Sequence, residues 1–129
     1  MKNDVHLFSL VKYILPEEIL NYFDIIKIEE QSAKELHIYL DERSIIPEGY
    51  STFTLSSKGF HAEALTKDFP IRNRSVMLHV RRRRWLVEQT NKVISRDWNL
   101  VAEGTRYTQS FAAFLKGVIG YLPDSKPFP

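Results

Sequence analysis

The strongest chemical signal in this sequence is a run of four consecutive arginines, Arg81 to Arg84. Adjacent cations repel one another and add nothing to an apolar core, so their clustering needs a ligand or a solvent-facing role. A guanidinium group is planar and donates paired hydrogen bonds, which suits phosphate oxygens and the edge of guanine. We therefore expect this run to lie against a nucleic-acid backbone.

Further basic side chains flank the run on both sides, whereas acidic ones are scarce there. The predicted DNA-binding residues are Arg72, Arg74, Arg81, Arg82, Arg83, Arg84, Lys92, Arg96 and Arg106. The alternative is a solvated edge strand whose charges prevent association with other sheets. Trp85 and Trp98 could stack on bases, but a tryptophan in a small β-unit is more often part of the core, and we expect core positions for both.

The charged residues are unevenly distributed along the chain. Residues 1–65 contain 6 Lys and Arg against 11 Asp and Glu, whereas residues 66–129 contain 12 against 5. Such an asymmetry indicates two surfaces with different partners. The basic half would attract a polyanion, and the acidic half would be repelled by it.

Other chemistries have little support. The absence of cysteine excludes disulfides, thiolate metal sites and cysteine nucleophiles. None of the four histidines has the spacing of a zinc site, although His61 and His79 could meet across a hairpin. The basic half shows no gathering of carboxylates for two metal ions, no glycine-rich phosphate loop and no serine–histidine signature. We predict a protein that is not an enzyme, with no catalytic residues, no metal and no cofactor.

Length and hydropathy indicate a cytoplasmic protein without a membrane partner. A chain of 129 residues corresponds to one domain, or to one domain with an appended element. No apolar run approaches the roughly 18 residues of a membrane helix. The N-terminus lacks the pattern of a signal peptide.

The segments that position the arginine run are expected to be strands. In the strand that precedes it, Val76, Leu78 and Val80 share one face. If this strand continues, Arg81 and Arg83 project on one side, and Arg82 and Arg84 project on the other. Earlier strands are expected at 50–55 and 60–69, although Ala62 to Leu65 could equally be helical. A turn at 88–92 leads to a returning strand at 93–98.

The remaining elements give an α+β fold. Residues 4–15 repeat apolar side chains at helical spacing, and Pro16 separates them from a second short helix. Residues 24–31 and 35–42 are predicted to form an antiparallel hairpin. Thr108 is expected to cap a helix that runs to about Ile119 and ends at Gly120.

Three regions follow from these elements. They are an acidic helix-hairpin region at 1–48, a basic DNA-binding module with a C-terminal helix at 49–120, and a mobile tail at 121–129. The turn Ile46-Pro-Glu-Gly49 is the expected boundary between the acidic and basic regions.

The segment from about residue 50 to 120 also resembles a known family. The matching runs are Ser57-Lys-Gly-Phe60, Asp68-Phe-Pro-Ile-Arg72, Val76 to Trp85, Ser95-Arg-Asp-Trp98, Ala102 to Thr108 and Phe111-Ala-Ala-Phe-Leu115. They resemble the N-terminal DNA-binding region of ISL-type bacterial insertion-sequence transposases. The resemblance is greatest to the Aon-type subgroup, in which this region is a short protein of its own.

The resemblance implies a zinc-ribbon-like β-unit that recognises the ends of an insertion element in double-stranded DNA. In the family, cysteine pairs hold this unit, but Tyr50 to Phe53 and Val87 to Gln89 stand near their positions here. The implied unit is therefore a degenerate, metal-free ribbon held by apolar packing. The family's catalytic domain lies beyond Pro129, so the resemblance implies no strand transfer by this chain itself.

Two functions are thus in view. The first is the DNA-binding N-terminal region of a transposase, whose acidic part holds a second copy of the chain or a separate catalytic chain. The alternative is an accessory or regulatory protein of transposition, whose arginines meet an acidic protein surface instead of DNA.

Overall fold

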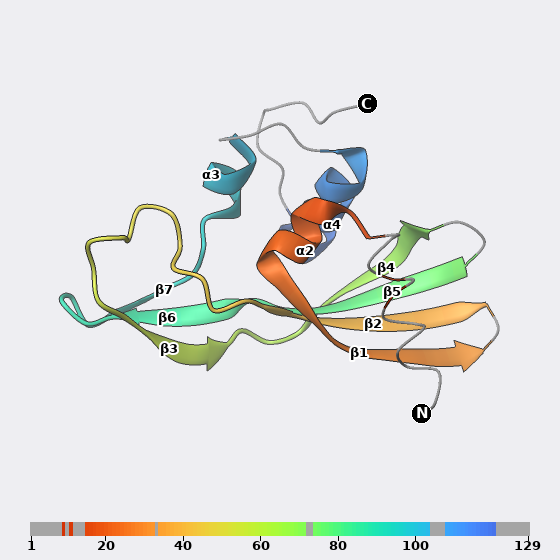
Figure 1. Ribbon diagram of the computed structural model, residues 1–129, viewed down its shortest axis with the longest axis horizontal. Coiled ribbons are helices and arrows are strands. Elements are labelled where there is room, and N and C mark those ends of the chain that lie inside the picture. Colours follow the sequence, from red (N-terminus) through yellow and green to blue (C-terminus); the bar gives the residue numbers. More distant parts are fainter. Residues whose placement is uncertain are drawn as a thin grey trace.

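The computed structural model describes residues 9, 11, 15–32, 34–71, 74–103 and 108–120, and these have an α+β architecture (Figure 1). The helices are α2 (Glu17–Tyr22), α3 (Trp98–Glu103) and α4 (Gln109–Ile119). The strands are β1 (Phe23–Ser32), β2 (Glu35–Glu42), β3 (Leu55–Phe60), β4 (Ala64–Ile71), β5 (Arg74–Arg81), β6 (Arg83–Val87) and β7 (Lys92–Ile94). None of the helices described here is long and apolar enough to cross a membrane.

The strands form two sheets. The chain passes from one sheet to the other between β3 and β4 and again between β5 and β6. The four-stranded sheet has the order β1-β2-β5-β4, in which β2 and β5 are parallel and the other neighbours are antiparallel. The three-stranded antiparallel sheet has the order β3-β6-β7. The amide of His61 donates to the carbonyl of Arg82 at 2.8 Å, so hydrogen bonding continues from one sheet to the other.

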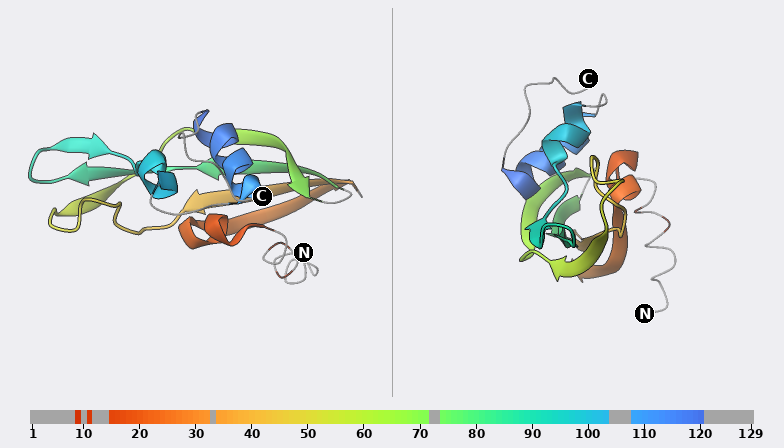
Figure 2. Two further views of the ribbon diagram at one scale, coloured as in Figure 1. Left: turned by 90° about the horizontal axis from the view of Figure 1, so that it is seen from above. Right: turned by 90° about the vertical axis from the view of Figure 1, so that its left-hand side faces the viewer.

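We call residues 55–60 and 82–94 the wing, because their sheet projects beyond the helices (Figure 2). The segment between β2 and β3 arches over the wing on the side where the helices lie (Figure 1). On the wing, Trp85 and Val87 are buried, while Leu86 between them is half-buried. This alternation gives the wing one covered face and one outer face.

The core lies between the four-stranded sheet and the helices. Alternate residues of β2 and β5 face this core, which gives each strand one buried side. The buried side chains of the two strands are Leu36, Ile38, Leu40, Val76, Leu78 and Val80, and α4 adds Phe111, Phe114, Leu115 and Val118. Burying each of these larger side chains stabilises the fold by about 1.5–3 kcal/mol.

Aromatic rings connect α3 to this core. The ring of Phe23 stacks on Trp98 with centroids 5.4 Å apart and meets Phe114 edge-on at 5.3 Å. Trp98 is 4% exposed and Trp85 is 3% exposed, so the prediction of core positions for both tryptophans is confirmed.

The C-terminal helix matches its prediction closely. The Thr108 hydroxyl accepts a hydrogen bond from the Phe111 amide at 3.2 Å, as an N-cap does. Gly120 ends α4 in the left-handed conformation with φ of 81°. Within the helix, Gly117 faces Thr66 of β4 so closely that an added Cβ would lie 2.6 Å from the threonine hydroxyl oxygen.

Other predicted boundaries were wrong. No strand is present at residues 50–54, because the chain there turns and pairing with β6 begins only at Leu55. The returning strand ends at Ile94, and α3 begins at Trp98, where the Asp97 carboxylate accepts from the Leu100 amide at 3.1 Å and caps the helix. Most of the helix predicted at 4–15 and the whole tail at 121–129 lie outside the described residues.

The acidic and basic regions share one sheet and one core. Strand β2 from the acidic region pairs with β5 from the basic region from Glu35 to Asp41. The four-stranded sheet therefore contains strands from both sides of the change of charge near residue 48.

Candidate nucleic-acid interface

The arginine run lies where one long strand passes from the four-stranded sheet into the wing. Strand β5 ends at Arg81, β6 begins at Arg83, and Arg82 stands between them. Opposite this point the β3–β6 register shifts between Ser57 and Phe60, and Gly59 there has φ of 85°. A bulge of this kind increases the local twist and redirects side chains.

The four arginines fall into two pairs, as strand alternation predicts. The guanidinium groups of Arg81 and Arg83 both lie over the ring of Phe60, at 4.3 and 4.7 Å from its centroid. Those of Arg82 and Arg84 both act on the imidazole of His61, where they help to lower its pKa. A flat phosphate surface would thus meet one pair at a time.

The first pair is engaged within the protein. Arg81 binds both carboxylate oxygens of Asp41, at 2.8 and 2.6 Å, and this hydrogen bonding raises the pKa of Arg81. Arg83 donates to the Ser57 hydroxyl at 2.9 Å and to the Glu42 carbonyl at 3.2 Å. These contacts occupy donors that a phosphate group would otherwise use.

The second pair is available to a ligand. The side chains of Arg82 and Arg84 are half-buried, and neither makes a hydrogen bond or an ion pair with any residue that the structure describes. A half-buried arginine covers apolar surface with its stem and leaves its charged end in water. Arg82 and Arg84 are therefore the arginines of the run best placed to bind an anion.

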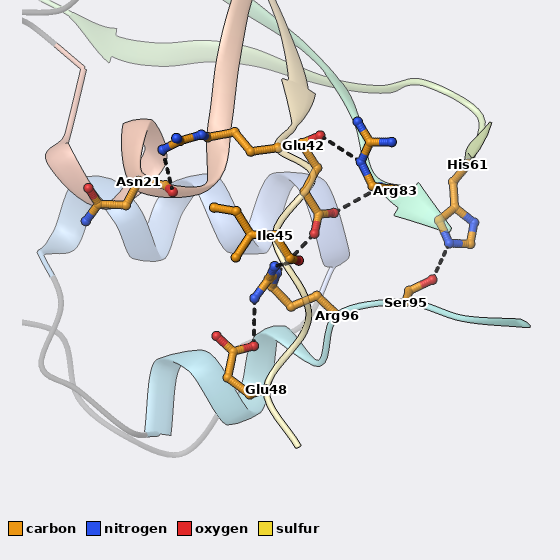
Figure 3. Close-up of polar contacts among 9 residues, drawn as sticks. Asn21, Glu42, Ile45, Glu48, His61, Arg83, Ser95 and Arg96 are labelled. Atoms are coloured by element: carbon orange, nitrogen blue, oxygen red, sulfur yellow. Dashed lines mark hydrogen bonds and ion pairs between the residues drawn. The ribbon is translucent and has the colours of Figure 1, made fainter. Parts of the chain in front are cut away.

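Arg96 has a different role from the one predicted. Its guanidinium is 1% exposed and donates to Glu42 at 3.0 Å, to Glu48 at 2.8 Å and to the Ile45 carbonyl at 2.6 Å (Figure 3). The second oxygen of the Glu42 carboxylate accepts from the Arg83 amide at 2.9 Å. We call Arg96, Glu42 and Glu48 the Arg96 clamp, and its buried guanidinium cannot reach DNA in this structure.

The other predicted contact residues are dispersed. Lys92 is exposed on the wing. Arg74 begins β5, at the end of the four-stranded sheet that is remote from the wing (Figure 1), and its side chain is not among those that the structure describes. Arg72 and Arg106 both fall outside the described residues. Lys58, which was not among the predicted residues, is exposed on the bulge of β3. The sequence signal for Lys58 was its position in the run Ser57-Lys-Gly-Phe60, one of the runs that resemble the DNA-binding family.

The wing thereby concentrates positive charge. It carries five cations, Lys58, Arg82, Arg83, Arg84 and Lys92, against the single carboxylate of Glu88. Its outer face also presents small and apolar side chains in register with Leu86, namely Ser56 and Val93. Val93 is 44% exposed. This combination of concentrated positive charge and exposed surface is typical of a polyanion-binding element.

A second polar group of residues lies on the other face of the four-stranded sheet from the core. His37 and His79 approach to 2.8 Å between ring nitrogens, and the other ring nitrogen of His79 lies 2.7 Å from the Glu63 carboxylate. Tyr39 stacks on His79 with centroids 4.1 Å apart and donates to Glu29 at 3.1 Å. These groups satisfy one another, which is typical of an internal hydrogen-bond network.

A hollow of about 380 Å³ adjoins this network and is lined by Ile26, Lys27, Tyr39, Asp41, Glu63, His79 and Arg81. His61 does not meet His79 there, because its Nε2 atom lies 2.5 Å from the Ser95 hydroxyl (Figure 3). In the part of the chain that the structure describes, no group of three or more His, Cys, Asp or Glu side chains could hold a metal ion.

Comparison with known proteins finds no matching protein-family model, no matching curated protein and no matching solved structure.

Proposed function

We propose that the protein binds double-stranded DNA through the wing, as the N-terminal DNA-binding region of an insertion-sequence transposase. The observation that carries this proposal is the pair Arg82 and Arg84, which have no acidic partner among the described residues and stand on a wing with a large excess of cations. Phosphate contacts supply most of the affinity of such an interface and fix its position on the duplex.

The shape of the wing supports the same proposal. The major groove of DNA admits a two-stranded β-ribbon, and β6 and β7 form such an antiparallel pair within the wing. Under this proposal the wing corresponds to the ribbon-like unit of the transposase family. Packing of Trp85 and Val87, which are 3% and 2% exposed, and the Arg96 clamp hold it in place of metal-bound cysteines.

The remaining parts of the chain have proposed roles in the same process. The acidic region, which includes α2 and β1, would hold a second copy of the chain or a separate catalytic chain, since its charge repels DNA. The chain itself would recognise element ends in the cytoplasm and leave strand transfer to that partner.

A salt titration tests this function. We expect the affinity for a labelled duplex from the element's end to fall steeply with salt, by a slope of about −0.9 for each phosphate that the protein neutralises. The variant Arg82→Gln/Arg84→Gln should have a shallower slope, by roughly 0.9 for each phosphate that is no longer neutralised. Fluorescence anisotropy at several salt concentrations measures both slopes.

The matched control is Lys34→Gln/Lys116→Gln, which removes two exposed charges outside the wing. It should leave the slope close to that of the unmodified protein. A wing variant with an unaltered slope would remove Arg82 and Arg84 from the interface. A scrambled duplex measured in parallel separates recognition of the element's end from binding to any DNA.

The alternative function, an accessory protein that acts through protein contacts, is favoured by apolar side chains on the uncovered face of the four-stranded sheet. Ile26 is 53% exposed and Leu65 is 43% exposed on either side of the histidine network. Failure to bind either duplex at low salt would favour this alternative over DNA binding.

A further inference from the structure

We infer that Arg82, Arg84 and His61 form one phosphate-binding site that takes up a proton when a phosphate group enters. The inference rests on the proposed function where the phosphate belongs to DNA. The site itself is defined by its chemistry for any phosphate group.

The backbone holds His61 beside the arginine run. Its amide donates to the Arg82 carbonyl at 2.8 Å, at the point where β3 gives way to β4. The Nε2 atom is engaged with the Ser95 hydroxyl at 2.5 Å, which fixes the orientation of the half-buried ring. The Nδ1 atom has no hydrogen-bond partner among the described residues, which leaves this nitrogen to take up the proton.

The charges that act on this ring are cations. Burial first, and then Arg82 and Arg84, lower the pKa of His61 below its usual range. The carboxylates of the adjoining segments have other partners: Glu63, two residues after His61, binds His79, and Glu42 binds the Arg83 amide and Arg96. The other arginines of this junction have partners of their own: Arg81 binds Asp41, Arg83 binds Ser57, and Arg96 binds Glu48.

A phosphate group would reverse this electrostatic balance. Its negative charge would neutralise the field of Arg82 and Arg84 and attract a proton to the imidazole, so the pKa of His61 should rise on binding. Protonated His61 would then become a third cation of the site. By linkage, any ligand that raises this pKa binds more tightly when the proton is present.

The direction of the pH effect follows from the two pKa values. Below the pKa of the free protein, His61 is protonated with and without phosphate, and above the pKa of the complex it is neutral in both. Between them, binding takes up a proton, so affinity should fall as pH rises, by up to about tenfold per pH unit.

The first test observes His61 directly in the unmodified protein. Its ring resonances are followed by NMR through a pH titration, alone and with saturating inorganic tripolyphosphate. We expect tripolyphosphate to raise the pKa of His61, and to leave it unchanged in Arg82→Gln/Arg84→Gln. An unaltered pKa in the unmodified protein with bound tripolyphosphate would overturn the inference.

The second test repeats the titration with the DNA duplex and compares affinities at pH 6 and pH 8. His61→Gln, with its fold checked by circular dichroism, should lose the preference for the lower pH. Tight, salt-dependent duplex binding without any effect on His61 would overturn the inference and leave the proposed function standing. If tripolyphosphate raised the pKa of His61 but the protein bound no duplex, the inference would stand and the proposed function would be overturned.

Discussion

Arg96 and Arg81 each bind a carboxylate, but only Arg96 does so away from water. The guanidinium of Arg96 is 1% exposed, as is the carboxylate of Glu42, whereas the side chain of Arg81 is 46% exposed. Removing one partner of a buried ion pair leaves the other charge without compensation in a medium of low polarity. An exposed pair loses little, because water replaces the partner.

We therefore expect Arg96→Gln to lower the free energy of unfolding by about 3–5 kcal/mol. The matched control, Arg81→Gln, should cost less than about 1 kcal/mol because solvent screens its pair with Asp41. Urea unfolding followed by tryptophan fluorescence measures both. Equal losses in the two variants would mean that the Arg96 clamp contributes no more than a surface pair.

The sequence alone could not separate Arg96 from the arginines available to a ligand. Its partner Glu42 lies 54 residues earlier in the chain, so the contact depends on tertiary structure and not on neighbouring residues. The alternation of Arg81 to Arg84 was predictable, because it depends on neighbouring residues of one strand. The freedom of Arg82 and Arg84 was not, because it depends on which acids the fold brings near.

Among the elements, α4 was the most predictable. Its cap at Thr108, its buried stripe and its end at Gly120 are all encoded within its own residues. The strand wrongly predicted at residues 50–54 depended instead on a distant part of the chain. Tyr50 and Phe53 have a high strand propensity, but a strand needs a partner, and β6 begins to pair only with Leu55. Local sequence could not locate that partner.

The packing of α4 on β4 gives a prediction at this scale. Replacing glycine by alanine inside a helix usually stabilises it by about 1 kcal/mol. Gly117→Ala should instead destabilise the protein by about 1–3 kcal/mol, because the new methyl group would meet the Thr66 side chain at 2.6 and 2.7 Å. Thermal unfolding and urea unfolding together measure the change in the free energy of unfolding.

The double variant Gly117→Ala/Thr66→Ala provides the control. It removes both Thr66 atoms that the methyl group meets most closely, and also a buried hydroxyl that has no hydrogen-bond partner in the described structure. We expect it to recover most of the stability that the single variant loses. A double variant as unstable as the single one would show that the helix does not lie this close to β4.

At the scale of the whole molecule, the α+β class was predictable but the order of the strands was not. The two predicted regions interleave, because β2 of the acidic region pairs in parallel with β5 of the basic region. Periodicity identifies strands but gives no information on which distant strands become neighbours. The resemblance-based expectation of a separate ribbon-like module likewise did not include this shared sheet.

The shared sheet predicts an uneven distribution of local stability. Central strands β2 and β5 have fully buried residues such as Ile38 and Leu78, whereas β7 is short and its Lys92 and Val93 are exposed. Native-state hydrogen exchange should show that amides of β2 and β5 exchange only through global unfolding, and those of β7 through local opening. Equal protection in both sets would contradict this distribution.

The parallel pairing of β2 with β5 also affects how the chain folds while it is being synthesised. The β1–β2 hairpin can form early from local contacts, but the other edge of β2 must wait for β5. In this pairing Arg81 of β5 lies opposite Asp41 of β2 and follows it by 40 residues. Pairing across such a separation is slow, and an unpaired apolar strand is prone to aggregate. The excess of carboxylates in the first 65 residues would keep these nascent chains apart by mutual repulsion until β5 emerges and closes the sheet.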